Sequence, residues 1–289
     1  MSESAINKLF VRHETNRLQI LRSETGSPVL VQHAAKDGRP YIHPIGAPDG
    51  KGCLTDNQPW HHLWQHGLYT GLHGVNGVDF WEEGLGGNGL AHDGTFHPKP
   101  LTTPILKGNN VSWMVETDWC SSSKENILTE YQKWSFEDIG TAFRLDLPWK
   151  LKAHCDICFE QCSYGGLFLR MPWHPSIGAT ALDSEGRGRA EAEGKRSRWV
   201  AVSMPLCGRE DNAGIAILEH PQNPVFPTPW RVDGNYGISP SRCILGDWKL
   251  EKGESSLEAY RLFIFCGVID SSIIEDEWKI FSQTERRIL

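Results

Sequence analysis

The apolar residues of this chain fall in short runs separated by turn signals, and only the last segment has the period of a helix. The runs 17–23 and 27–35 are joined by Glu24-Thr25-Gly26, which predicts a β-hairpin. The runs 109–121 and 125–138 predict a second pair of strands. Further strands are expected at 141–162, 165–173, 198–206, 213–220 and 256–269. Because strands and helices do not alternate, a parallel doubly wound sheet is disfavoured.

The C-terminal segment SSIIEDEWKIFSQTE is the one stretch that is expected to form a helix. Ser272 and Glu275 have the spacing of a capping box at its start. Ile274, Trp278 and Phe281 would share one apolar face, which would pack against the rest of the protein.

These patterns predict an all-β fold, namely a large antiparallel β-sandwich with one short C-terminal helix. The chain shows no internal repeat and no composition boundary, so residues 1–289 are expected to form a single β-sandwich domain. The charged, glycine-broken segment 184–197 is expected to be an exposed loop between two strands.

Charge and hydropathy limit the partners of such a chain. The formal net charge is −7 and no basic patch follows the sequence, so nucleic acid is not an expected partner. No run of 18 apolar residues is present, so no membrane association is expected. The first residues lack an apolar core of a signal peptide and the eight cysteines are scattered, which favours a cytoplasmic protein with reduced thiols. Assembly into a homo-oligomer stays open.

Three cysteines, Cys155, Cys158 and Cys162, have a spacing that could indicate a redox or zinc site. Their segment has no glycine or proline between them and lies in a strand-like run. Buried thiols on a strand are therefore the favoured interpretation.

The stretch HHLWQHGLYTGLHGVNGVDFWEEG, residues 61–84, is the richest in residues that can carry chemistry. His62 and His66 have a spacing that zinc sites use on a helix, but four glycines between 67 and 77 argue against a long helix here. We therefore expect no metal and no cofactor, and we expect these histidines to bond locally or to contact a substrate. The candidate catalytic residues in this stretch are His62, His66, Asp79 and Glu83.

The second half of that stretch, VNGVDFWEEG, suggests a carbohydrate site. Asn76-Gly77 predicts a tight turn, after which Asp79 and Glu83 flank the aromatic pair Phe80-Trp81. A carboxylate accepts hydrogen bonds from sugar hydroxyls, and an aromatic ring offers a flat face to the sugar's C–H bonds. The alternative, that the two rings belong to the core and the two acids to the solvated surface, carries about equal weight.

Further candidate binding residues lie at predicted strand ends and in the proline-rich segment 217–237, where a stiff loop could form one wall of a site. The full set expected to contact a substrate is His43, His73, Trp81, Arg170, His174, His220, Trp230 and Arg231. For Arg170 and His174, which lie in the segment FLRMPWHP (168–175), a structural role is the more common alternative.

Four motifs, YIHPIGAPDG, HGVNGVDFWEEG, YGGLFLRM and GIAILEHPQNPVFPTPWRV, occur in an order and spacing that resemble one family. This is the group of bacterial proteins labelled "methane oxygenase PmoA-like", and the resemblance extends from about residue 17 to the end of the chain. Relatives often carry an HPHHRG-like run before the VNG turn, where this chain reads HHLWQHG. The resemblance implies a carbohydrate role, because such proteins tend to be encoded beside sugar-catabolic enzymes, and a sandwich related to galactose mutarotase.

Together, the motifs and the resemblance predict a protein that acts on a glycoside or an oxidised sugar. His62 or His66 would be the acid or base, with Asp79 or Glu83 as its carboxylate partner, in a hydrolase, lyase or epimerase. A non-catalytic carbohydrate-binding protein is the first alternative. A histidine-ligated metal enzyme, such as the oxygenase in the family label, is the second. A small sugar or glycoside is the expected partner in the first two cases.

Overall fold

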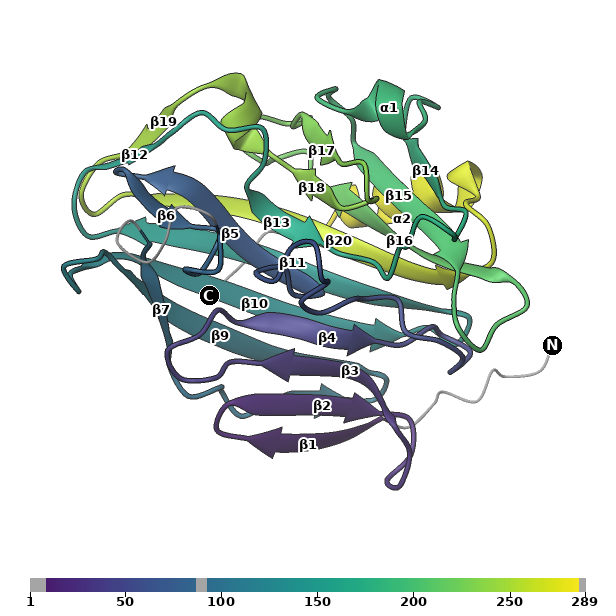
Figure 1. The fold of residues 1–289 in the computed structure, drawn as a ribbon. Coiled ribbons are helices and arrows are strands. Elements are labelled where there is room, and N and C mark those ends of the chain that lie inside the picture. Colours follow the sequence, from purple (N-terminus) through teal and green to yellow (C-terminus); the bar gives the residue numbers. More distant parts are fainter. Residues whose placement is uncertain (1–8, 87–92, 286–289) are drawn as a thin grey trace.

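The computed structural model describes residues 9–86 and 93–285 of the chain. Within these ranges the strands form two antiparallel sheets, with eleven strands in the first and nine in the second, packed face to face (Figure 1). The predicted all-β sandwich is therefore confirmed.

The first sheet runs in the spatial order β1 (Phe10–Glu14), β2 (Arg17–Leu21), β3 (Pro28–His33), β4 (Tyr41–Ile45), β5 (Leu68–Val75), β13 (Gly166–Leu169), β18 (Ile238–Pro240) and β17 (Trp230–Val232). Three short strands extend it beside β5, namely β6 (Val78–Phe80), β12 (Ile157–Phe159) and β19 (Trp248–Leu250). The predicted hairpin is β2–β3, in which Ile20 lies opposite Leu30.

The second sheet runs in the order β14 (Thr180–Asp183), β15 (Trp199–Pro205), β16 (Asn212–Glu219), β20 (Ser255–Cys266), β11 (Ala142–Ala153), β10 (Asn126–Asp138), β9 (Asn110–Cys120) and β7 (Thr95–Pro98), with β8 (Ile105–Lys107) paired to β9. The predicted second strand pair is β9–β10, in which Trp113 lies opposite Trp134. Along β9, every second side chain is buried, as a sheet with one face in the core requires.

Most tryptophans of the central strands serve as core mass between the two sheets. A buried carboxylate, that of Glu130 on β10, accepts hydrogen bonds from the indoles of Trp119 and Trp149 and from the hydroxyl of Thr70 on β5. Thr70 belongs to the first sheet and Glu130 to the second, so this network joins the two sheets across the core. Three donors compensate the burial of the carboxylate, which would otherwise be costly.

The C-terminal helix α2 (Ser271–Ser282) forms as predicted, but its start differs from the prediction. The N-cap is Asp270, whose carboxylate accepts hydrogen bonds from the backbone amides of Ser272 and Ile273. The predicted capping box is wrong, because Glu275 instead accepts a hydrogen bond from the indole of Trp199 at 2.9 Å. The expected apolar face of α2 packs against the second sheet, on the side of that sheet away from the first sheet (Figure 1).

Two other expectations need correction. The segment 184–197 is mostly exposed, but it contains a one-turn helix, α1 (Arg189–Ala192), and its Ala192 is buried. Of the cysteines expected on a buried strand, only Cys158 lies in one, and all three are partly exposed. A 3-10 turn, Arg242–Leu245, completes the elements of the described chain. No helix among the described residues has the length and apolar character to cross a membrane.

Candidate functional site

An aromatic cluster covers the outer face of the first sheet, away from the second sheet. Successive side chains of a strand point to opposite faces, so Thr70 and Leu167 face the core while Tyr69 and Phe168 face outward. The rings of Tyr69 and Phe168 have centroids 5.4 Å apart, and Trp81 lies within 5.4 Å of both. The three rings are buried, and the partly buried side chains of Trp64 and Tyr164 pack against them, so a ligand would reach the cluster mainly at its edge.

The turn after β5 brings Trp81 to this cluster. Asn76 and Gly77 both have positive φ, 51° and 75°, as the predicted tight hairpin turn requires. Of the two rings that follow, Phe80 enters the core and stacks on Trp119 at 5.0 Å, while Trp81 joins the outer cluster. Phe80 therefore lies in the core, whereas Trp81, which is also buried, lies on the outer side of the first sheet.

A cavity of about 190 Å³ lies against this cluster. It is smaller than the roughly 300 Å³ at which drug-sized ligand sites begin, which suits a single small ring. We call it the aromatic cavity. Its walls come from the loop before β5, the turn after β6, β13 and the segment that precedes it, and β17, and they consist of His62, Trp64, Gln65, Trp81, Glu82, Tyr164, Phe168, Arg231 and Asp233.

Arg170 organises one polar wall of the aromatic cavity. Its guanidinium is buried and donates to Gln65 Oε1 at 2.6 Å and to Asp233 Oδ2 at 2.7 Å. Burial alone would raise the pKa of Asp233, but the charge and hydrogen bonds of Arg170 lower it below its usual value. Asp233 is therefore a fixed, ionised acceptor at the cavity wall. Arg231 is held by Glu193 at 2.6 Å, which gives a donor beside that acceptor.

Two other titratable groups of this cavity have pKa values that move in opposite directions. Burial and the nearby charge of Asp79 raise the pKa of Glu82. Burial and the positive charge of Arg170 lower the pKa of His62. A raised carboxyl pKa favours the protonated form that a general acid needs, and a lowered imidazole pKa favours the neutral form that a general base needs. A side chain at Gly86 would overlap the carboxylate of Glu82, so glycine there leaves room for the acid.

Several buried polar atoms around the cavity lack a partner among the described residues. They include Nε1 of Trp64, Nδ1 of His62, both ring nitrogens of His61 and the hydroxyl of Tyr69. A buried polar atom without a hydrogen bond costs roughly 1–3 kcal/mol, and native proteins keep few of them. Of these residues, His62 and Trp64 line the aromatic cavity, where a polar ligand would supply the missing partners.

Beside the aromatic cavity, His66 and Glu83 form a buried ion pair. His66 Nε2 lies 3.0 Å from Glu83 Oε2, and its Nδ1 lies 2.7 Å from Asn57 Oδ1. The ring of Tyr41 stacks on the imidazole at 4.6 Å. Burial would raise the pKa of Glu83, but the charge of Arg39 and the bond from His66 lower it. With both ring nitrogens engaged, His66 fixes the position of the loop that carries His62.

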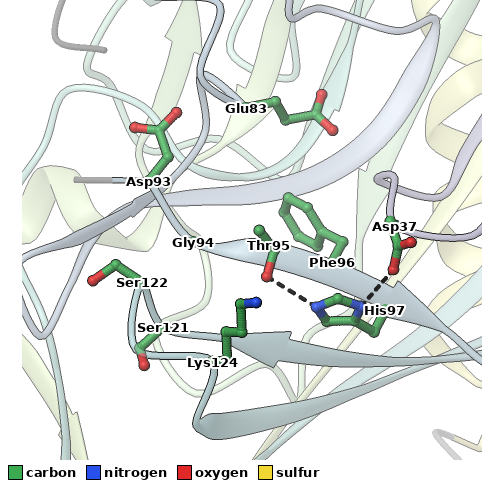
Figure 2. A pocket seen from close by; sticks show the side chains of 10 residues that line it. All are labelled: Asp37, Glu83, Asp93, Gly94, Thr95, Phe96, His97, Ser121, Ser122 and Lys124. Atoms are coloured by element: carbon green, nitrogen blue, oxygen red, sulfur yellow. Dashed lines mark hydrogen bonds and ion pairs between the residues drawn. The ribbon is translucent and has the colours of Figure 1, made fainter. Parts of the chain in front are cut away.

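A larger cavity, of about 1010 Å³, is lined by Glu83 and by residues of β7 and the β9–β10 turn (Figure 2). At its floor, His97 lies between Asp37, 2.8 Å from its Nδ1, and Thr95, 2.9 Å from its Nε2 (Figure 2). The order of hydroxyl, imidazole and carboxylate matches that of a catalytic triad. The side chains of His97 and Asp37 are, however, 40% and 56% exposed, so water screens the pair.

The remaining candidates lie at different distances from the aromatic cavity. Asp79 accepts from the backbone amide of Trp81 at 2.6 Å and pairs with His73 at 3.3 Å, which raises the pKa of His73. This pair supports the wall behind Trp81. His43, on β4, is hydrogen-bonded through Nδ1 to Thr55 Oγ1 at 2.9 Å, and it lines neither of the two cavities described above.

Three candidates lie elsewhere in the described structure. His174 is exposed in a turn, where it bonds Ser176. His220 lies under α2 and is 3.0 Å from the carbonyl of Thr284. Trp230 is fully buried on β17 and donates to the carbonyl of Ser197. None of the three lines the aromatic cavity.

Sequence reasoning did not select Glu82, Tyr164 or Asp233 as site residues. Each lies beside or within a signal that was used, since Glu82 precedes Glu83, Tyr164 opens the YGGLFLRM motif, and Asp233 lies in the proline-rich segment 217–237. Among the described residues, no three His, Cys, Asp or Glu side chains converge as metal ligands would.

Solved structures with detectable likeness to this chain have low identity and low TM-scores. They include the GH36 α-galactosidase AgaA of Geobacillus stearothermophilus (9% identity, TM-score 0.40, 90% of this chain and 40% of that chain). A galactose mutarotase related enzyme of Lactobacillus acidophilus is similar over 89% of this chain and 97% of that chain (7% identity, TM-score 0.35). A proposed aldose 1-epimerase of Klebsiella pneumoniae is similar over 94% and 84% (11% identity, TM-score 0.38). The chain thus spans less than half of the α-galactosidase.

No curated protein sequence matches the chain. The family model that matches covers residues 22–279 and describes a family of unknown function, DUF6807. This finding corrects the resemblance to the methane oxygenase PmoA-like group, because no comparison returns that label. The shared motifs were real patterns of this chain, but they were assigned to the wrong family. With more than half of its length matched, the chain belongs to the DUF6807 family.

Proposed function

We propose that the protein binds a sugar ring in the aromatic cavity and converts it by general acid–base chemistry. The observation that carries the proposal is the composition of this one small cavity. Aromatic walls, a fixed ionised carboxylate, a guanidinium, a histidine and a second carboxyl group all line the same space of about 190 Å³. A pyranose ring needs this combination, because it has apolar C–H faces and a polar rim of hydroxyls.

Recognition would divide between the two kinds of wall. Trp81 and Tyr164, with centroids 4.8 Å apart, would contact the C–H face of the ring. Asp233 would accept hydrogen bonds from hydroxyls, and Arg231 would donate to ring or hydroxyl oxygens. Because Arg170 already holds Asp233, little conformational freedom is lost when a ligand binds.

For the chemical step, Glu82 would be the general acid and His62 the general base. The raised pKa of Glu82 keeps a proton available for the ring oxygen or the glycosidic oxygen of the substrate. The lowered pKa of His62 keeps the imidazole neutral, so that it can take a proton from water or from a hydroxyl. One proton is given and one is taken, so the enzyme returns to its starting charge after exchange with solvent.

This assignment keeps one of the four catalytic candidates that the sequence suggested, His62, and uses the others as support. His66 and Glu83 fix the loop that carries His62, and Asp79 fixes the backbone of Trp81. Hydrolysis, elimination and epimerisation would all use the same pair of proton transfers. The second candidate function, sugar binding without conversion, would use the same walls but not the two titratable groups.

The test is NMR observation of a panel of free sugars, glycosides and 3-keto-glycosides incubated with the protein and with three variants. Glu82→Gln and His62→Ala should each lower kcat by roughly 10²- to 10⁴-fold and leave the KM within a few-fold of the wild-type value. His97→Ala, a histidine of the larger cavity, should leave both constants unchanged.

The outcomes separate the alternatives. Conversion that survives in both Glu82→Gln and His62→Ala would contradict the assigned roles. Saturable sugar binding without any conversion would favour the binding protein, and loss of activity in His97→Ala alone would move the site to the larger cavity.

A further inference from the structure

Beside the aromatic cavity stands an exposed tryptophan that its walls do not use. Trp60 is 80% exposed, the highest value for a large hydrophobic side chain in the described part of the chain. Leu63, on the same loop, is 47% exposed. Single exposed apolar side chains are common, but a fully presented indole beside a ligand cavity is a feature of binding surfaces.

A continuous series of rings connects Trp60 to the cavity. The centroids of Trp60 and His61 are 5.2 Å apart, those of His61 and His62 are 4.9 Å apart, and those of His62 and Trp64 are 5.1 Å apart. His62 and Trp64 line the aromatic cavity, so the series runs from solvent to the cavity wall. Each contact is edge to face, which aromatic pairs prefer.

The loop that carries this series is held in place by its own backbone. The amide of His62 donates to the carbonyl of Pro59 at 2.9 Å, and the amide of Gln65 donates to the carbonyl of His62 at 3.0 Å. The amide of Gln58 closes the loop by donating to the carbonyl of Gln65 at 2.7 Å. Trp60 is therefore presented by two consecutive turns inside a closed loop, and a ligand that stacks on it orders few further groups.

The polar atoms of the series point to the same kind of ligand as the cavity. Both ring nitrogens of His61 are buried and have no partner among the described residues, and the same is true of Nε1 of Trp64. The rings thus combine flat apolar surface with unused hydrogen-bonding groups along one path. A second ring that carries hydroxyls would satisfy both.

We propose that Trp60 is the platform of a second subsite and that the substrate is a glycoside with a ring on each side of the scissile or reacting bond. The first sugar would occupy the aromatic cavity, and the second sugar or aromatic aglycone would stack on Trp60, with His61 beside it. This inference rests on the proposed function for the first ring and extends it by naming the substrate class. It makes Trp60 a specificity residue that does not take part in the proton transfers.

The experiment compares methyl and phenyl glycosides of glucose and galactose, in both anomers, against the wild-type protein and Trp60→Ala. Dissociation constants from calorimetry and, where conversion occurs, kcat/KM are measured for each pair. Trp60→Ala should weaken binding and kcat/KM for phenyl glycosides by roughly three- to tenfold, the range of an aromatic stacking pair, and leave methyl glycosides unchanged. Trp60→Phe should recover part of the loss.

Two controls isolate the platform. Leu63→Ala removes an exposed apolar side chain from the same loop, and Val268→Ala removes one, 71% exposed, from a different part of the chain. Both should leave the contrast between phenyl and methyl glycosides as in the wild type. Because Trp60 is exposed, the unfolding midpoint of Trp60→Ala should also match that of the wild type.

The outcomes keep the subsite and the catalytic proposal distinct. An equal effect of Trp60→Ala on both glycosides, no effect on either, or no binding of phenyl glycosides to the wild type would overturn the platform. A changed oligomeric state with unchanged glycoside binding would also overturn it and assign Trp60 to a protein contact. A Trp60-dependent preference for phenyl glycosides without conversion would support the platform and overturn only the proposed chemistry.

Discussion

The aromatic cavity and the larger cavity are lined by consecutive residues, Glu82 in the smaller and Glu83 in the larger, yet their surroundings differ in kind. The smaller cavity has aromatic walls and buried polar atoms, whereas the larger has an exposed floor on which His97 and Asp37 form a screened pair. The larger cavity has more than five times the volume of the smaller. Because electrostatic interactions are strong only where water is excluded, we propose the smaller cavity rather than the larger one as the reactive site.

The largest expected effect separates the two neighbouring glutamates by stability. Glu83→Ala removes the carboxylate partner of His66 and of the fully buried side chain of Arg39. Breaking a buried ion pair at one partner typically costs about 3–5 kcal/mol, because the other charge is left uncompensated. Among the described residues Glu82 makes no ion pair, so Glu82→Ala should change the free energy of unfolding by less than about 1 kcal/mol.

Urea unfolding of both variants, followed by tryptophan fluorescence, measures this difference. Glu83→Gln serves as the control for side-chain volume and should fall between the wild type and Glu83→Ala. Equal destabilisation of the two alanine variants would show that the two glutamates do not differ in the way the comparison requires.

The next effect is the dependence of the rate on pH, which only the smaller cavity should govern. Below its pKa, which lies below the ordinary 6.5, His62 becomes protonated and can no longer take a proton, so the rate falls as pH decreases. Above its pKa, which lies above the ordinary 4.5, Glu82 loses its proton and can no longer give one, so the rate falls as pH increases. The profile of kcat/KM against pH should therefore be bell-shaped, with an acid limb set by His62 and an alkaline limb set by Glu82, and with about a tenfold loss per pH unit on each limb.

Two variants make this profile specific to the assigned groups. The residual activity of Glu82→Gln should lack the alkaline limb, and that of His62→Ala should lack the acid limb. A profile that keeps both limbs in both variants would place the titrating groups elsewhere.

The fold was predictable from sequence because its signals are local. The period of two in segments such as 109–121, the turn at Glu24-Thr25-Gly26 and the helical period near the C-terminus each depend on neighbouring residues only. The start of α2 was mispredicted for two reasons. Asp270 is the N-cap and accepts from the first backbone amides, and Glu275 accepts a hydrogen bond from Trp199 instead of closing a capping box. That choice depends on Trp199, which lies 76 residues before Glu275 in the sequence, and no local pattern contains it.

The residues of the candidate site were predicted only in part. Trp81 and His62 lie in the stretch 61–84 and Arg231 in the proline-rich segment, and all three line the aromatic cavity. Glu82 was missed because strand geometry would group every second residue, but β6 ends at Phe80. Beyond it, Glu83 has a φ of 51°, and the resulting turn places neighbouring carboxylates in different cavities. Asp233 was missed because its role depends on a contact with Arg170, 63 residues earlier.

The smallest expected effect concerns the floor of the larger cavity. Asp37→Asn keeps the size of the side chain and removes the charge that faces His97. Because both side chains are well exposed, the pair should contribute no more than about 1 kcal/mol to the free energy of unfolding, and the contribution should decrease as salt is added. The variant should also leave kcat/KM for any sugar unchanged, since Asp37 does not line the aromatic cavity. Calorimetric unfolding in low and high salt, together with the glycoside assay, measures both quantities. If Asp37→Asn lowered the rate a hundredfold, the order Thr95, His97 and Asp37 would have to be treated as a working triad, and the contrast between a buried reactive cavity and an exposed inert one would fail.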